Sequence, residues 1–330
     1  MANKENDQYW IGFDLGGTKM LAVVFDRQFR PLGRARRKSK GFEGKRAGLK
    51  RIVETVHDAV ADADINLSRV GGIGIGCPGP LDIRRGVIHE APNLGWKDVP
   101  VKSTLEKELN CPAIVANDVD IGVYGEYRFG AGRDAHCVAG LFPGTGIGGG
   151  CVFRGQLLQG ANCTAMEIGH IPIMADGPLD GAGNCGTLEA LASRLAISSA
   201  AAAAAYRGHA PALRESAGTD ISAIRSGALS RSIDQGDQAV EKIVRHAAGH
   251  LSLGIVTMVL LLAPDVVVLG GGLVEAMPDL FVEEVRQRTR ERLLPAYRDV
   301  FRIVVAELGD NAGVMGAAAW ARELIEANNE

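Results

Sequence analysis

The chain has 330 residues, more than the roughly 250 to 300 at which a single hydrophobic core usually stops growing, so two domains are expected. Its 36 basic and 39 acidic residues give a net charge of −3, which excludes the overall positive charge that sequence-independent binding to nucleic acid requires. Hydrophobic residues at 46% exclude a chain disordered throughout, and the 43 glycines, about 13% of the chain against an average near 7%, indicate tight turns and sites lined by backbone.

The first ten residues are polar and lack the apolar core of a signal peptide. The longest apolar run, residues 255–263, is too short to span a bilayer. The six cysteines lie far apart with no Cys-x-x-Cys pair, which is typical of reduced thiols. We therefore expect a cytoplasmic protein without a membrane partner.

The first glycine-rich segment lies between two predicted strands. Residues 9–13 and 20–25 are apolar, and residues 14–19 read Asp-Leu-Gly-Gly-Thr-Lys. The exposed N–H groups of such a turn, with the threonine hydroxyl, can hold phosphate oxygens. The candidate phosphate-binding residues are Gly16, Gly17, Thr18 and Lys19. Asp14 precedes them and is a candidate Mg²⁺ ligand, directly or through water, because a hard cation prefers carboxylate oxygen.

Asp118 stands where an apolar strand, residues 114–116, meets a helical stretch. This is the carboxyl-terminal edge of a strand, where the sites of α/β proteins form. Phosphoryl transfer needs a group that accepts the proton of the attacking hydroxyl, and Asp118 suits that role. Taken alone, an aspartate at this place would more simply be a helix cap.

The second glycine-rich segment repeats the order of strand, turn and strand. Residues 136–142 and 151–153 are the predicted strands, residues 143–150 are the predicted glycine turn, and the chain therefore looks internally duplicated. Gly144, Thr145 and Gly146 are its candidate phosphate-binding residues. Gly144-x-Gly146-x-x-Gly149 matches the dinucleotide fingerprint, but that motif requires a helix next, and a strand follows here. A Walker loop is absent as well, and the default alternative is a structural turn.

A third glycine corner follows the apolar run at residues 266–269. It consists of Gly270, Gly271 and Gly272, and we expect it to converge with the two glycine turns on one cleft. Before it, residues 198–205 contain six consecutive alanines, which predict a helix. Alternation of such helices with short β-branched runs predicts an α/β protein.

Seven ordered motifs resemble those of the ROK sugar kinases (repressor, open reading frame, kinase) of the actin-like ATPase superfamily. They are the turn at 14–19, Pro-Gly-Pro-Leu-Asp at 78–82, Pro-Asn-Leu-Gly-Trp at 92–96, Ala-Asn-Asp at 116–118, the glycines at 144–150, Glu-Ile-Gly-His at 167–170 and Gly-Thr-Leu-Glu at 186–189. The resemblance covers nearly the whole chain, which leaves little room for chance agreement.

The resemblance implies two RNase-H-like lobes with a central cleft. The N-terminal lobe would span residues 1–118 and be completed by the last helix, residues 312–327, and the C-terminal lobe would span 119–311 with Gly270, Gly271 and Gly272 as its adenosine corner. The implied sugar-binding residues are Gly79, Asn93, Asn117, Asp118, Glu167, His170 and Glu189. This chain departs from the family at Met166, where glycine is usual.

The resemblance also implies a hexose kinase that uses ATP and Mg²⁺ and transfers the γ-phosphoryl group to the 6-hydroxyl of its sugar. Glucose is the favoured substrate, and relatives suggest a homodimer. The alternatives are a fructose or N-acetylhexosamine kinase, a polyphosphate-dependent glucokinase, and a non-catalytic sugar sensor. Repressor relatives carry a winged helix before the first turn, and Asp14 comes too early for one, so no nucleic-acid partner is expected.

Zinc-binding relatives add three cysteines to the histidine that matches His170. The corresponding positions here are Asp180, Ala182 and Thr187. Because a structural zinc site is almost always a closed set of four nitrogen and sulfur ligands, we expect no structural zinc and expect a protein hydrogen bond to orient His170. The alternative is a rearranged site that recruits Cys163 and Cys185 with Asp180.

Overall fold

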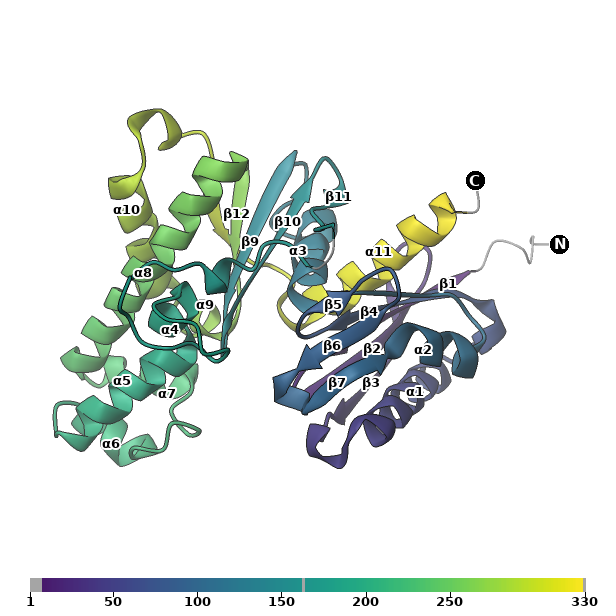
Figure 1. Cartoon of the computed structure of the whole chain (residues 1–330), viewed down its shortest axis with the longest axis horizontal. Helices are drawn as coiled ribbons and strands as arrows, with labels where there is room; N and C mark the ends of the chain where they lie inside the picture. The colour runs from purple at the N-terminus through teal and green to yellow at the C-terminus, as the bar shows by residue number, and fades with distance from the viewer. Residues whose placement is uncertain (1–7, 162–163, 329–330) are drawn as a thin grey trace. The chain divides into compact units, whose positions relative to one another are not determined.

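The computed structural model describes residues 8–161 and 164–328 and divides the chain into two compact units (Figure 1). Unit 1 consists of Met1–Asp134, Gly155–Ala165 and Glu307–Glu330, and unit 2 of Ala135–Arg154 and Met166–Ala306. The compact units thus divide after Asp134 and not after residue 118. The helix that begins at Asp118 stays in unit 1 because it packs against the last helix of the chain.

Unit 1 contains nine strands and four α-helices among its described residues. The strands are β1 (Tyr9–Leu15), β2 (Lys19–Phe25), β3 (Pro31–Lys38), β4 (Val70–Cys77), β5 (Leu81–Asp82), β6 (Val87–Ala91), β7 (Trp96–Pro100), β8 (Ala113–Asn117) and β11 (Gln156–Leu157). The helices are α1 (Lys45–Asp62), α2 (Val101–Leu109), α3 (Asp118–Phe129) and α11 (Ala312–Ala327), with short helices η1 (Gly41–Glu43), η2 (Leu67–Arg69), η3 (Pro92–Leu94) and η7 (Gly309–Asn311).

Unit 2 contains four strands, β9 (Cys137–Pro143), β10 (Ile147–Phe153), β12 (Val266–Leu269) and β13 (Arg302–Val305). Its helices are α4 (Leu188–Ala192), α5 (Arg194–Tyr206), α6 (Pro211–Ala217), α7 (Ser226–Asp234), α8 (Gln238–Leu262), α9 (Gly272–Ala276) and α10 (Glu283–Arg292). Short helices η4 (Ile168–His170), η5 (Pro278–Val282) and η6 (Pro295–Tyr297) complete it.

The two units share one strand plan, which confirms the predicted α/β fold and the duplication. In unit 1 the strand order is β3-β2-β1-β4-β8, with β1 antiparallel to β2 and parallel to β4. In unit 2 the order is β10-β9-β12-β13, with β9 antiparallel to β10 and parallel to β12. Each sheet thus starts from a hairpin whose turn is one of the two predicted glycine turns.

The sequence of β4 explains how the sheet of unit 1 carries helices on both faces. Ile73 and Ile75 face the apolar core that includes α1, and the intervening Gly74 faces α11, because successive residues of a strand point to opposite faces. A Cβ on Gly74 would lie 1.9 Å from the carbonyl oxygen of Ala317. The backbone of α11 therefore rests directly on the backbone of β4 (Figure 1).

Helix α8 runs through the core of unit 2, where Val244, Leu251 and Ile255 are fully buried. The apolar run at residues 255–263 is only the end of this helix, which extends over 25 residues. The length of the apolar segment was therefore underestimated from the sequence. By length and composition α8 is the one helix of the described chain that could cross a membrane. Of its most apolar stretch, 56% is buried inside the structure, and core helices of soluble proteins meet the same criterion.

We predict that Gly74→Ala destabilises the protein by about 1–3 kcal/mol or more, because the added methyl group would overlap the carbonyl of Ala317. The matched control is Gly122→Ala in α3, where no heavy atom lies within 4 Å of the new Cβ and alanine favours the helix by roughly 0.5–1 kcal/mol. Denaturation by urea measures both, and equal midpoints for the two variants would contradict the close packing of α11.

Candidate active site

The first predicted phosphate site is the tight turn between β1 and β2. Gly16, Gly17 and Thr18 join the two strands, and the turn is open to solvent at Thr18. Ser39 is fully buried and fastens this turn. Its hydroxyl donates to the carbonyl of Gly16 at 2.5 Å, and its N–H donates to the carbonyl of Thr18 at 2.9 Å. The sequence did not reveal Ser39, because a single serine after a strand carries no motif.

Asp14 lies near the end of β1, half-buried beside the first turn of α11. A Cβ on Gly313 of that turn would lie 3.5 Å from Cγ of Asp14. Burial raises the pKa of Asp14 to about 6, against the opposing charges of Lys19 and Arg36, and no described residue donates a hydrogen bond to its carboxylate. A half-buried carboxylate without a hydrogen-bond donor, next to the positive end of a helix, fits a divalent cation that would favour its ionised form.

Lys19 begins β2 and forms an ion pair with Asp310, with 2.9 Å between Nζ and Oδ2. Arg36 of β3 reaches the same carboxylate at 3.0 Å. The hydrogen bond from Lys19 is the main reason that the pKa of Asp310 is lowered. All three side chains are largely exposed, so the pairs are weak and exchange readily with other anions. Arg36 and Asp310 were not predicted, because 274 residues separate them in the chain.

Asp14 and Asp118 lie at the same edge of the unit 1 sheet. The parallel register pairs Asp14 with Gly76 of β4, and Gly76 in turn with Ala116 of β8. Asp118 follows two residues after Ala116, and its Cα lies 3.2 Å from the place of a Cβ on Gly76. The carboxyl ends of the parallel strands therefore bring the predicted metal ligand and the predicted base to one edge.

Asn117, rather than Asp118, is the N-cap of α3. Its side-chain oxygen accepts hydrogen bonds from the N–H groups of Val119 at 2.8 Å and Asp120 at 3.2 Å. Asp118 is the first residue of the helix, and its Oδ1 accepts from the N–H of Val119 at 3.0 Å. The helix cap that was the alternative role for Asp118 is thus formed mainly by Asn117.

Gly79 and Asn93, the remaining predicted sugar-binding residues of unit 1, lie in loops after β4 and β6. Gly79 has a φ of 85°, and a Cβ there would lie 2.0 Å from the carbonyl oxygen of Glu90, so this position is restricted to glycine. Asn93 is exposed in η3, and its Cβ lies 3.0 Å from the place of a Cβ on Gly17. The motif at residues 92–96 therefore adjoins the first glycine turn.

The second glycine turn is shorter than predicted. β10 begins at Ile147, so glycines 148–150 belong to a strand that pairs with β9 and not to a loop. The turn itself consists of Gly144, Thr145 and Gly146, closed by a hydrogen bond from the N–H of Gly144 to the carbonyl of Gly146 at 2.8 Å. Gly149 is needed within the strand because a Cβ there would lie 2.5 Å from the side chain of Ile168.

Arg194, the first residue of α5, holds the second turn in place. Its N–H donates to the carbonyl of Gly144 at 2.9 Å, and its guanidinium donates to the hydroxyl of Thr145 at 2.7 Å. Burial and the charge of Arg225 lower the pKa of Arg194. The sequence did not reveal this residue, since the contact joins the turn to a helix some 49 positions later.

Glu189 also binds the second turn. Its Oε2 accepts a hydrogen bond from the N–H of Ile147 at 2.9 Å, and a Cβ on Gly146 would lie 2.2 Å from the same oxygen. Thr187 caps α4, the helix that carries Glu189, by accepting from the N–H of Ala190 at 3.3 Å. A predicted sugar ligand and a predicted phosphate loop are therefore in direct contact within unit 2.

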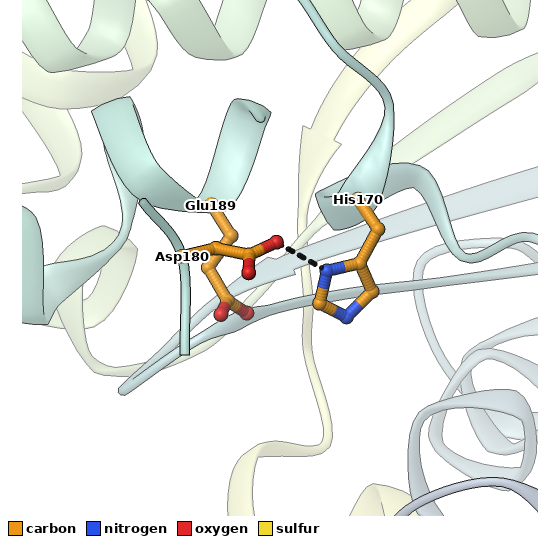
Figure 2. A group of neighbouring side chains, drawn as sticks. All are labelled: His170, Asp180 and Glu189. Atoms are coloured by element: carbon orange, nitrogen blue, oxygen red, sulfur yellow. Dashed lines mark hydrogen bonds and ion pairs between the residues drawn. The ribbon is translucent and has the colours of Figure 1, made fainter. Parts of the chain in front are cut away.

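His170 lies in η4, and its Nδ1 is 2.8 Å from Oδ2 of Asp180 (Figure 2). This is a protein hydrogen bond of the kind expected from the sequence. Burial would lower the pKa of His170, but the hydrogen bond that the ring donates to Asp180 and the charge of Glu189 together raise it. One ligand atom from each of His170, Asp180 and Glu189 lies within 4.8 Å of the others.

Residues on either side of this cluster complete the segment. Glu167 is exposed and immediately precedes η4. Met166 has a φ of 60°, in the left-handed region, which explains why glycine is the usual residue of the family there. Of the alternative zinc ligands, Cys163 lies outside the described residues, and Cys185 lies 2.9 Å from the carbonyl oxygen of Gly177.

The third glycine corner joins β12 to α9 and adjoins the second turn. A Cβ on Gly270 would lie 2.3 Å from the ring of Phe142, and one on Gly271, where φ is 88°, would lie 3.0 Å from the carbonyl oxygen of Pro143. Gly272 begins α9. Unit 2 therefore brings two of its glycine loops together, as predicted for backbone-lined sites.

The predicted site residues fall into two sets, one in each unit. Unit 1 holds the first turn, Asp14, Gly79, Asn93, Asn117 and Asp118. Unit 2 holds the second turn, Glu167, His170, Glu189 and the third corner. Each set contains a glycine turn with an exposed threonine, Thr18 or Thr145, and carboxylate groups that can bind hydroxyls.

Comparisons with known proteins identify the family of the chain. Residues 10–324 match the family model described as "ROK family". The chain is similar to the glucokinase of Thermotoga maritima, with 31% identity over 96% of this chain and 98% of that protein. It is also similar to two solved structures. One is a ROK hexokinase from Thermus thermophilus (32% identity, TM-score 0.81, 97% and 100% of the two chains covered). The other is a ROK family glucokinase from Streptomyces griseus in complex with glucose and AMPPNP (30% identity, TM-score 0.83, 96% and 99% covered).

We predict that Asp14→Asn stabilises the metal-free protein above pH 7 and has little effect below pH 4. The folded wild type keeps the Asp14 proton up to about pH 6, whereas the unfolded chain releases it near 3.8, so wild-type stability falls as the pH rises between these values. The gain at pH 8 should be no more than about 3 kcal/mol, and smaller where solvent reaches the group.

Thermal unfolding in EDTA from pH 4 to pH 8 measures this difference. Asp279→Asn, which removes an exposed carboxylate of unit 2, serves as the control. Parallel stability curves for the wild type and Asp14→Asn would show that burial does not raise the pKa of Asp14.

Proposed function

The chain belongs to the ROK family, and we infer from this membership that it is an ATP-dependent glucokinase. The observation that carries the inference is its similarity, over nearly the whole length of both chains, to a glucokinase solved with glucose and AMPPNP. Glucokinases of about 30% identity that align along nearly the entire chain support the same substrate. The enzyme is accordingly a phosphotransferase with an alcohol group as acceptor.

We propose that Asp118 is the general base. The 6-hydroxyl oxygen of glucose forms a bond to the γ-phosphorus of ATP, the bond from that phosphorus to the bridging oxygen of ADP breaks, and the hydroxyl proton passes to the Asp118 carboxylate. Its place at the carboxyl edge of the unit 1 sheet supports this role, as does the cap formed by Asn117, which fixes the first turn of α3.

The phosphate chain of ATP would be held by the three glycine-rich segments. We assign this role to Gly16, Gly17 and Thr18 of the first turn, to Gly144, Thr145 and Gly146 of the second, and to Gly270, Gly271 and Gly272 of the third corner. Lys19 would exchange the exposed carboxylate of Asp310 for a phosphate oxygen, which is favourable because the pair with Asp310 is open to solvent.

Asp14 would hold Mg²⁺, directly or through a water molecule. When bound, the ion neutralises charge that develops on the phosphate oxygens. The half-buried, hydrogen-bond-free carboxylate of Asp14 supports this assignment. Because the pKa of Asp14 is about 6, the carboxylate is ionised in solution above that pH. A bound cation would favour the ionised form at lower pH as well.

The sugar would be bound by polar groups of the backbone and side chains. We propose Gly79, Asn93, Asn117 and Asp118 from unit 1, and Glu167, His170 and Glu189 from unit 2. Exposure of Asn93 and Glu167 supports their availability to a ligand. Glu189 already accepts a hydrogen bond from Ile147 through Oε2, so it would bind a hydroxyl and brace the second turn at once.

We further propose that the enzyme acts as a cytoplasmic homodimer with no nucleic-acid partner. The free thiols of Cys77, Cys111, Cys137 and Cys185 support a reducing compartment. The net charge of −3 argues against nucleic acid.

The decisive test of the function is a substrate panel. Purified protein with Mg²⁺ and either ATP or polyphosphate is offered glucose, mannose, fructose and N-acetylglucosamine, and the sugar phosphate is measured directly. Glucose with ATP should give the highest kcat/KM. Turnover confined to polyphosphate, or to another sugar, would replace the proposed specificity, and no turnover with any pair would remove the enzymatic role.

Asp118→Asn should bind glucose with an affinity close to that of the wild type and lose about 10²- to 10⁴-fold in kcat, because the amide keeps hydrogen bonds but cannot accept the proton. Isothermal titration measures binding, and a coupled assay measures turnover. Asp58→Asn, which removes an exposed carboxylate of α1, should leave both unchanged. Normal turnover in Asp118→Asn would remove this residue from the mechanism.

A further inference from the structure

We propose that Asp180 is a positioning residue that fixes the ring of His170 so that its Nε2 accepts a hydrogen bond from a sugar hydroxyl. The identity of the ligand in this inference rests on the proposed function. The protonation state of the His170 ring does not depend on that function and can be measured separately.

The contact between the two side chains fixes the tautomer of His170. The Asp180 side chain has no exposed surface, and its Oδ2 lies 2.8 Å from Nδ1 of His170. An ionised carboxylate has no proton to give, so Nδ1 must carry the hydrogen of the bond. In the neutral ring Nε2 then has a free lone pair, and Figure 2 shows this nitrogen pointing away from Asp180.

Asp180 is held in its ionised form by other donors. Its Oδ1 accepts hydrogen bonds from the N–H groups of Ala182 and Asn184, both at 2.9 Å, and its Oδ2 accepts from the hydroxyl of Thr187 at 3.0 Å. Burial alone would raise the pKa of Asp180, but these bonds and the one from His170 lower it well below its usual range. Oxygens with this many donors can only accept from His170.

The same carboxylate also connects His170 to Glu189. The hydroxyl that Thr187 donates to Asp180 accepts from the N–H of Ala190 and so caps α4. Glu189 lies in the first turn of that helix. Loss of the Asp180 carboxylate would therefore free His170 and loosen the cap that orients Glu189.

Hydrogen bonds account for this cluster without a metal ion. His170, Asp180 and Glu189 lie close enough to share a cation, but both oxygens of Asp180 already face N–H or O–H donors. Glu189 likewise receives the N–H of Ile147 at 2.9 Å. A cation bound here would have to displace the N–H and O–H donors that already bind the carboxylate oxygens of Asp180 and Glu189.

The first measurement is the tautomer of His170 in the intact protein. In ¹⁵N-histidine-labelled wild type, at a pH where the ring is neutral, two-bond ¹H–¹⁵N correlations should show His170 protonated at Nδ1, with His170→Gln identifying the signal. The Nε2–H form in the wild type would overturn the inference. So would a His170 signal that shifts when EDTA removes a metal found by elemental analysis.

The second measurement compares Asp180→Asn with Asp176→Asn, which removes an exposed carboxylate from the same segment. Asp180→Asn should convert His170 to the Nε2–H form or a mixture, and should raise the glucose KM about 10-fold or more with the ATP KM within 2-fold. In a His170→Ala background most of this change in glucose KM should disappear. Equal glucose KM values for Asp180→Asn and Asp176→Asn would overturn the inference.

The two proposals fail in different ways. If the wild type neither binds nor phosphorylates glucose, the proposed function is wrong and the sugar role of His170 falls with it, whatever the tautomer. If it phosphorylates glucose with His170 in the Nε2–H form, the function stands and the role of Asp180 is wrong. Because the wild-type spectrum does not require Asp180→Asn, this test holds even if that variant does not fold.

Discussion

The site of unit 1 depends on the close approach of the last helix of the chain to its first strand. A Cβ on Gly12 of β1 would lie 1.7 Å from the carbonyl oxygen of Val314, so α11 can lie on the sheet only because this side chain is absent. The same approach places Gly313 beside Asp14 and brings Asp310, just before α11, to Lys19. The charge environment of the first glycine turn is thus set by residues some 291 positions later.

The parts of the fold that follow from local pattern could be predicted from the sequence. β1 and β2 lie where the apolar runs at 9–13 and 20–25 were seen, and the six alanines lie in α5. The two hairpins and the edge position of Asp118 also follow from such patterns, because strand periodicity and turn composition are local properties. Ser39, Arg194 and Asp310 could not be found in this way, since each acts on a turn far from it in sequence.

The roles of several glycines could not be predicted from the local sequence. The excess of glycine was expected to serve turns and backbone-lined sites, and Gly79, Gly146 and Gly271 do lie in loops. Gly12 and Gly74, however, allow α11 to pack closely on the sheet, and Gly149 allows η4 to pack closely on β10. The reason for such a glycine is the group that approaches it from elsewhere in the chain. For the same reason the second turn was predicted too long, because glycines 148–150 look like a loop until their neighbours are known.

The residue that takes the place of a metal ligand near His170 changes what that histidine can do. The resemblance to zinc-binding relatives implied that Asp180, Ala182 and Thr187 stand at the positions of their cysteines, but not which group would bind the ring instead. A cation on Nδ1 would leave the proton of a neutral ring on Nε2, which would then be a hydrogen-bond donor. The Asp180 carboxylate places the proton on Nδ1 and makes Nε2 an acceptor. A sugar hydroxyl facing His170 would therefore donate its hydrogen here, so its oxygen remains free to accept from another residue of the site.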